Sequence, residues 1–223
     1  MRLLLLPLIG IASCALASAA QDPVPRSSYD EWRVIYHDGE RLGYERTRFR
    51  HDGETLSIFA TAVPDSARSR GGVVLDERSA FVVDTSGVIR SFTQRSVSRP
   101  GRFVEYIGNV DGEQFTMTTK TPGRTFEREF VVPPETRAEI WFQWHLRQDP
   151  MPQKSRTRFR VFRPGIGSDT SQVQVTTGSW RRVQLPSGAR RKLLPMTLKR
   201  TSYSGESQQL YVDGIGQLSL IHI

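Results

Sequence analysis

A chain of 223 residues is long enough to form one hydrophobic core, or one core with appendages. Its formal net charge of +8 comes mainly from arginine, and the arginines are spread over nearly every segment, as is typical of solvated strand faces. Because the sequence has neither an RNA-recognition signature nor a basic helix, we expect no nucleic-acid partner.

The N-terminal residues have the pattern of an export signal. Arg2 precedes an apolar run, 3–12, that is too short to span a membrane, and small residues at 17–19 form a cleavage site. Cys14 leaves a second route open, because residues 11–14 also resemble a bacterial lipoprotein box. The sequence predicts a signal peptide over 1–20 and a periplasmic or cell-envelope protein, with membrane attachment only if Cys14 is lipidated. Cys14 is the only cysteine, so no disulfide can form within the chain.

After a linker, 21–30, the stretch 31–50 predicts a first hairpin. Extended runs rich in aromatic and β-branched residues flank Asp38-Gly39, which is the strongest short-range hairpin signal. A type I′ loop at this dipeptide predicts three pairs: His37 with Glu40, Ile35 with Leu42 and Val34 with Gly43. Gly43, which has no side chain, would leave room for the rings of Trp32 and Tyr36.

Alternating apolar and polar residues, separated by turn residues, predict about a dozen strands in all. Asp52-Gly53 and Asp111-Gly112 indicate further hairpin turns, and the polar run 64–72 predicts an exposed loop. The strands expected after the first hairpin are 54–63, 73–84, 88–98, 102–110, 113–121, 124–132, 156–163, 171–177, 180–185, 189–201 and 208–213. In 124–132, Phe126, Phe130 and Val132 fall on one face. We therefore expect a mainly β fold, an antiparallel curved sheet or half-barrel, in one β-domain over 31–217.

The pattern changes once, after Pro133-Pro134. Residues 135–147 have helical composition with acidic residues near the start. We expect this helix to pack against the open side of the curved sheet. Its aromatic residues are candidates either for that packing or for lining an apolar ligand cavity: Trp141, Phe142 and Trp144.

Residues 218–223, LSLIHI, are the translation of CTG TCT CTT ATA CAC ATC, the end sequence of a transposon adaptor used in DNA library preparation. We therefore expect this tail to derive from a sequencing adaptor and the chain to be cut at this point. The alternative is a natural apolar edge strand.

No catalytic motif stands out. The sequence contains no H-E-x-x-H, no G-x-S-x-G, no Walker loop and no G-x-G-x-x-G. His145 has no second histidine at metal-ligand spacing, and His37 and His51 each precede an Asp-Gly turn. No pair of carboxylates is distinguished from the rest. We therefore predict no catalytic residue, no metal and no cofactor, and a domain that is not itself an enzyme.

The order of several softer motifs resembles a known family. They are W-x-V-x-Y-x-x-G-x-x-x-G-Y at Trp32–Tyr44, Ser91-Phe92, Gly108-x-x-x-Gly112, Pro150-Met151, Phe162-x-Pro164 and Val183-x-Leu185-Pro186-x-Gly188. Over 31–216 this order resembles the N-terminal β-domain of exported bacterial transglutaminase-like proteins of the planctomycete type. The resemblance implies an accessory domain that positions or regulates a downstream Cys-His-Asp catalytic domain in the same chain. None of those catalytic residues lies in this sequence.

Two other classes of function stay open. The curved sheet and helix also resemble periplasmic lipid or lipoprotein carriers, which would imply an apolar ligand. An enzyme that acts through carboxylates of this domain is the third class, because a sequence does not show which Asp and Glu side chains meet in space.

Overall fold

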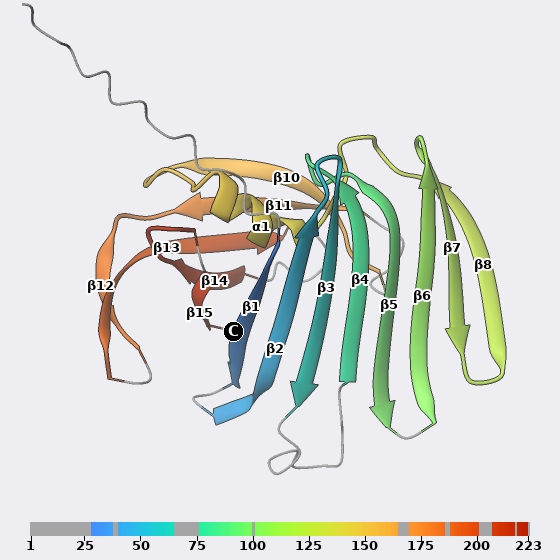
Figure 1. The fold of residues 1–223 in the computed structure, drawn as a ribbon, viewed down its shortest axis with the longest axis horizontal. Helices are drawn as coiled ribbons and strands as arrows, with labels where there is room; N and C mark the ends of the chain where they lie inside the picture. Colours follow the sequence, from blue (N-terminus) through green and yellow to red (C-terminus); the bar gives the residue numbers. More distant parts are fainter. Residues whose placement is uncertain are drawn as a thin grey trace, which may run out of the picture.

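The computed structural model describes residues 28–37, 40–64, 76–99, 101–164, 170–185, 188–200, 207–216 and 218–222. Side chains are not described at 35–37, 40–42, 64, 99 and 218–222. These residues form two β-sheets and one helix (Figure 1). The predicted signal peptide with Cys14, most of the predicted linker, the Asp38-Gly39 loop and most of the 64–72 loop lie outside the described residues.

The large sheet contains eight strands in chain order, each antiparallel to the next (Figure 1, blue to yellow-green). Such a meander needs only short connections. Glycine supplies the positive φ at the two predicted turns, +102° at Gly53 and +61° at Gly112. The strands are β1 (Ser28–His37), β2 (Glu40–His51), β3 (Thr55–Pro64), β4 (Asp76–Asp84), β5 (Ile89–Arg99), β6 (Arg102–Asp111), β7 (Gln114–Thr121) and β8 (Arg124–Val131). Because β1 starts at Ser28, the strand takes in the last three residues of the predicted linker 21–30.

The second sheet contains seven strands in the order β15-β14-β13-β11-β10-β9, with β12 paired to β13. Its strands are β9 (Arg137–Ala138), β10 (Arg156–Phe162), β11 (Ser171–Thr177), β12 (Arg181–Gln184), β13 (Arg190–Arg200), β14 (Ser207–Val212) and β15 (Leu218–His222). The pair of β9 and β10 is parallel, and the other pairs are antiparallel. The expectation of a mainly β, antiparallel fold with one helix is confirmed, and the described strands do not close into a barrel. The adaptor origin proposed for 218–223 stays a prediction.

The register of the first hairpin differs from the predicted one. The observed pairs are His37 with Glu40, Ile35 with Gly43 and Val34 with Tyr44. The first pair is as predicted, and the others are shifted by one residue because a bulge lies between Ile35 and Tyr36. A bulge adds a residue to one strand only, so counting from the turn does not detect it. Trp32 therefore lies beside Tyr44, with ring centroids 5.6 Å apart, and not across from Gly43.

Helix α1 is Trp141–Gln148, so the predicted start at Glu135 is wrong. The segment before it is extended because its partners lie on other elements. Arg137 and Ala138 pair with the end of β10, and the Ala138 N–H donates to the Gly87 carbonyl at 3.1 Å. The acidic residues expected in the first turn of the helix form ion pairs instead: Glu135 with Arg160 at 2.9 Å, and Glu139 with Arg200. Tertiary pairing here overrides helical composition.

Helix α1 is buried on two sides. Trp141 and Trp144 belong to the core of the large sheet, whereas Phe142 and Leu146 belong to the core of the second sheet. Residues three or four apart share a helix face, so the two pairs point to different sheets. Phe162 of β10 joins the large-sheet core, where its ring centroid lies 5.2 Å from Phe92 and 5.3 Å from Phe115.

Strand β8 is an edge of the large sheet, and its predicted apolar face is only partly covered. Val132, just beyond its end, is 2% exposed, whereas Phe126 is 54% exposed. The face shared by Phe126, Phe130 and Val132 is therefore buried beyond the end of β8 and exposed nearer its start.

Close packing in the large sheet depends on a glycine at position 108. Gly108 of β6 pairs with Phe92 of β5, and the ring of Phe92 lies over it. A Cβ atom at position 108 would lie 2.1 Å from Cε1 of Phe92, which is inside any normal contact distance. Phe92 and Gly108 belong to the motifs on which the family resemblance rests. Their packing against each other explains why the sheet needs a phenylalanine and a glycine at these two positions.

We expect Gly108→Ala to lower the free energy of unfolding by about 1–3 kcal/mol, the range for an overpacked core. Urea denaturation measures the change. Gly214→Ala is the control, because a Cβ at that position would meet nothing within 4 Å. Equal midpoints for Gly108→Ala and the wild type would contradict the packing of Phe92 over Gly108.

Candidate functional site

The strand register arranges the inner face of the large sheet in rows that cross its strands. One row is apolar: Phe49, Ile58, Phe81, Phe92, Gly108 and Met117. The next row is polar or small: Glu31, Thr47, Ala60, Ser79 and Gln94. The row after it is Arg33, Glu45, Ala62, Glu77 and Ser96. The inner face thus changes from apolar to polar along the strands.

A cleft of about 700 Å³ lies over the polar rows. Its floor on the large sheet includes Ala60, Ala62 and Ser79. The facing wall comes from α1, the residues before it and the second sheet. Its apolar members are Ile140, Phe142, Phe162, Pro164, Leu198 and Leu210, and its polar members are Glu139, Gln143, Arg163, Arg200, Ser207 and Gln208. The large sheet therefore supplies a polar and small floor, and the facing wall supplies the aromatic and aliphatic side chains among polar ones.

The charged side chains of the cleft are balanced in sign: Arg33, Arg163 and Arg200 against Glu45, Glu77 and Glu139. Most of them are paired within the cleft. The guanidinium of Arg33, whose side chain is only 9% exposed, pairs with Glu45 and donates to Thr47 Oγ1 at 3.3 Å. Gln94 Nε2 donates to Glu77 Oε1 at 2.6 Å. Such pairing offsets the cost of burying charge.

Two polar atoms of the cleft residues have no hydrogen-bond partner within the described part of the chain. They are Nε of Arg33, a donor, and Oε1 of Gln143, an acceptor, and both atoms are buried. A buried polar atom without a partner costs free energy. A polar group of a bound molecule would remove that cost, so the two atoms are candidates for contact with a ligand.

Tyr29 of β1 is partly buried and packs against the core of the large sheet, next to the polar rows. Burial raises its pKa far above the ordinary value, and this effect exceeds that of the nearby Arg147 guanidinium, which lowers it. The Cζ atom of Arg147 lies 4.0 Å from the centroid of the Tyr29 ring. The phenol is therefore protonated at neutral pH and is not suited to act as a general base.

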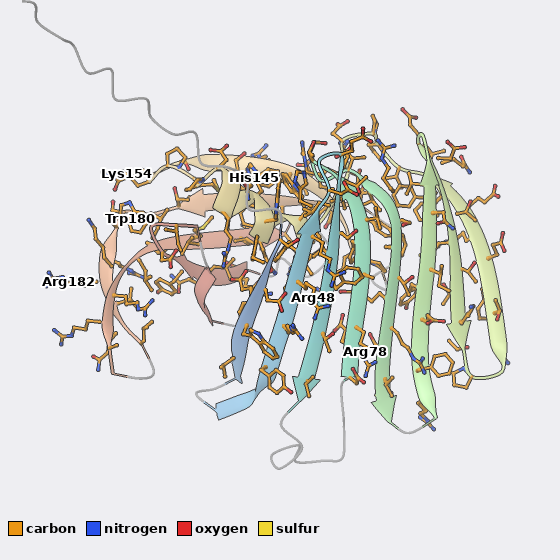
Figure 2. The ribbon with its side chains drawn as sticks, in the orientation of Figure 1. Arg48, Arg78, His145, Lys154, Trp180 and Arg182 are labelled. Carbon is orange, nitrogen blue, oxygen red and sulfur yellow. The ribbon has the colours of Figure 1, made fainter. Side chains whose placement is uncertain are left out.

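His145 of α1 is half-buried against Trp141, with ring centroids 4.6 Å apart (Figure 2). Burial lowers its pKa below the ordinary 6.5, assisted by Arg137 and opposed by Asp149. Among the described residues, no group of three or more His, Cys, Asp or Glu side chains is placed to hold a metal ion. In the same part of the chain, no helix is both long and apolar enough to cross a membrane.

The structure places the predicted aromatic residues in two environments. Phe142 lines the cleft, whereas Trp141 and Trp144 lie in the large-sheet core and do not. All three are buried. The polar rows of the cleft were not among the predicted site residues. Their signal is present in β2, where Glu45 and Thr47 alternate on the same face as the core residue Phe49.

Comparisons with known proteins give little beyond the fold described here. No family model and no curated protein matches this chain. Among solved structures, the crystal structure of a DUF1089 family protein, PA1994 from Pseudomonas aeruginosa, is similar with a TM-score of 0.42 and 12% sequence identity. The match covers 95% of this chain and 94% of that chain. A similarity this low carries no argument about function.

The lowered pKa of His145 predicts how stability depends on pH. Below about pH 6.5, His145 is protonated in the unfolded chain before it is protonated in the folded protein. The free energy of unfolding therefore falls as the pH drops from 6.5 towards the pKa of His145 in the folded protein. His145→Gln should reduce the fall in Tm between pH 7.5 and pH 5. At pH 7.5 both proteins have a neutral side chain at position 145. The difference between their Tm values at this pH therefore measures the effect of the substitution on packing. Parallel Tm curves over the whole range would show that burial does not disfavour the charged form.

Proposed function

We propose that this protein is a non-catalytic binding protein that holds an amphipathic small molecule in the cleft between its two sheets. The proposal is carried by one observation: the inner face of the large sheet is filled by α1 and Phe162 over its apolar rows and is open over its polar rows. The volume of about 700 Å³ lies in the range of small-molecule sites. Mostly apolar walls with a few fixed polar groups are also typical of such sites.

The two walls suggest how the ligand lies. Its apolar part would contact the side formed by Phe142, Phe162 and Leu210. Its polar part would lie near Arg33 of the large sheet and Gln143 of α1. This arrangement supports the lipid-carrier class among the functions left open by the sequence. The proposal includes export to the periplasm or cell envelope, which rests on the pattern of residues 1–20.

The proposed binding is tested by filling the floor of the cleft. Ala62→Phe should weaken binding of the apolar fluorophore 1-N-phenylnaphthylamine by about tenfold or more, because the new ring would occupy the ligand volume. Ala80→Phe is the matched control, since Ala80 pairs with Phe59 on the outer face of the same sheet. Fluorescence titration gives both dissociation constants. Equal affinities for the two variants, or no binding by the wild type, would contradict the proposal.

A role as accessory domain is a second proposal, and it rests on the order of motifs shared with transglutaminase-like proteins. It concerns a catalytic domain beyond these residues, so it is compatible with a ligand in the cleft. We expect the longer gene sequence to encode a downstream domain with a nucleophilic Cys, a His and an Asp. A natural stop codon close to Gly216 would contradict this role and leave the binding proposal intact.

A further inference from the structure

The outer face of the large sheet carries large apolar side chains that are exposed among the described residues. Trp32 is 57% exposed, Val34 47% and Phe59 43%. Tyr44 lies beside Trp32 on the same face. We call Trp32, Tyr44 and Phe59 the outer patch; Val34 is not included because it also lines the cleft. These side chains alternate with the inward rows, so they point away from the core and the cleft.

Arginines surround the outer patch. In the row of Trp32, the paired residues across the sheet are Arg46, Thr61, Arg78, Arg95, Glu105 and Lys120, and Arg48 and Arg50 follow on β2. Figure 2 labels Arg48 and Arg78 on the large sheet. Arg78 and Arg95 lie directly opposite each other, an arrangement of like charges that destabilises a sheet.

The acidic side chains of this face neutralise only part of that charge. Asp30 pairs with Arg46 and, at 3.4 Å, with Arg48. Asp76 pairs with Arg78 at 3.1 Å, yet the Arg78 side chain is 69% exposed. Arg50 and Arg95 form no ion pair within the described residues. The face is thus apolar and aromatic at its centre and positively charged around it.

We propose that the outer patch binds the surface of an anionic lipid bilayer. Tryptophan and tyrosine favour the interface between lipid and water, because their rings are amphipathic. Arginines near an anionic leaflet gain from its negative potential, and the chain as a whole has a formal net charge of +8. The Cζ atom of Arg46 lies 5.0 Å from the centroid of the Trp32 ring, so a basic group accompanies the most exposed ring. The inference is independent of the ligand proposed for the cleft.

Co-sedimentation with vesicles tests the inference. The full chain should bind vesicles of phosphatidylglycerol and phosphatidylcholine, should bind pure phosphatidylcholine much less, and should bind less at high salt. Trp32→Ser should weaken binding, because it removes the ring that enters the interface. The double variant Arg50→Gln, Arg78→Gln should bind anionic vesicles about 25-fold more weakly, because each arginine near the membrane contributes about fivefold to the affinity.

Matched changes elsewhere on the surface provide the controls. Phe126→Ser removes an exposed ring from β8, and Arg124→Gln with Arg182→Gln removes two exposed arginines. These variants should bind like the wild type, as should Ala62→Phe in the cleft. Residues 1–20 are common to all variants, so differences among them come from the substituted positions. The inference is overturned if the wild type binds neutral and anionic vesicles equally, or if the patch variants bind as tightly as their controls.

Discussion

Helix α1 packs on one end of the inner face of an eight-stranded sheet, and this contact divides core from cleft. An antiparallel sheet with one apolar face has to cover that face. Trp141 and Trp144 do so from the helix, and Phe162 does so from β10. Phe142 and Gln143 of the same helix line the cleft, so the helix forms the border between the covered apolar row and the open polar rows. The second sheet packs on the opposite side of the same helix, through Phe142 and Leu146, and the cleft opens between the two sheets.

The polar rows explain why this part of the sheet is not core. Burying charged groups beneath a helix would cost free energy unless every group found a partner. Here the partners lie within the rows: Arg33 pairs with Glu45, and Gln94 donates to Glu77. Within the described part of the chain, one buried atom of Arg33 and one of Gln143 have no hydrogen-bond partner, and the small side chain of Ala62 lies at the floor. The sheet therefore offers space and a few fixed polar contacts at the same place.

Sequence patterns predicted the features of the fold that depend on residues close together in the chain. Alternation located the strands well, and the predicted 171–177 coincides with β11, because each strand buries one face. The bulge at Ile35 changed the register without leaving a signal in the turn. The start of α1 was mispredicted because Arg137 and Ala138 pair with β10, which no local pattern shows. The polar floor of the cleft could have been read from β2, but its facing wall depends on where β13 and β14 lie in space.

Methyl NMR can show whether a ligand occupies the space between the polar rows and the second sheet. On titration with 1-N-phenylnaphthylamine, we expect shift changes at the methyl groups of Ala60, Ala62 and Leu210, which line the cleft. The methyl groups of Leu56 and Val83, fully buried in the large-sheet core, should change little. Shifts confined to the outer face, at Ala80 and Val82, or no shifts at any of these methyl groups, would contradict ligand binding in the cleft.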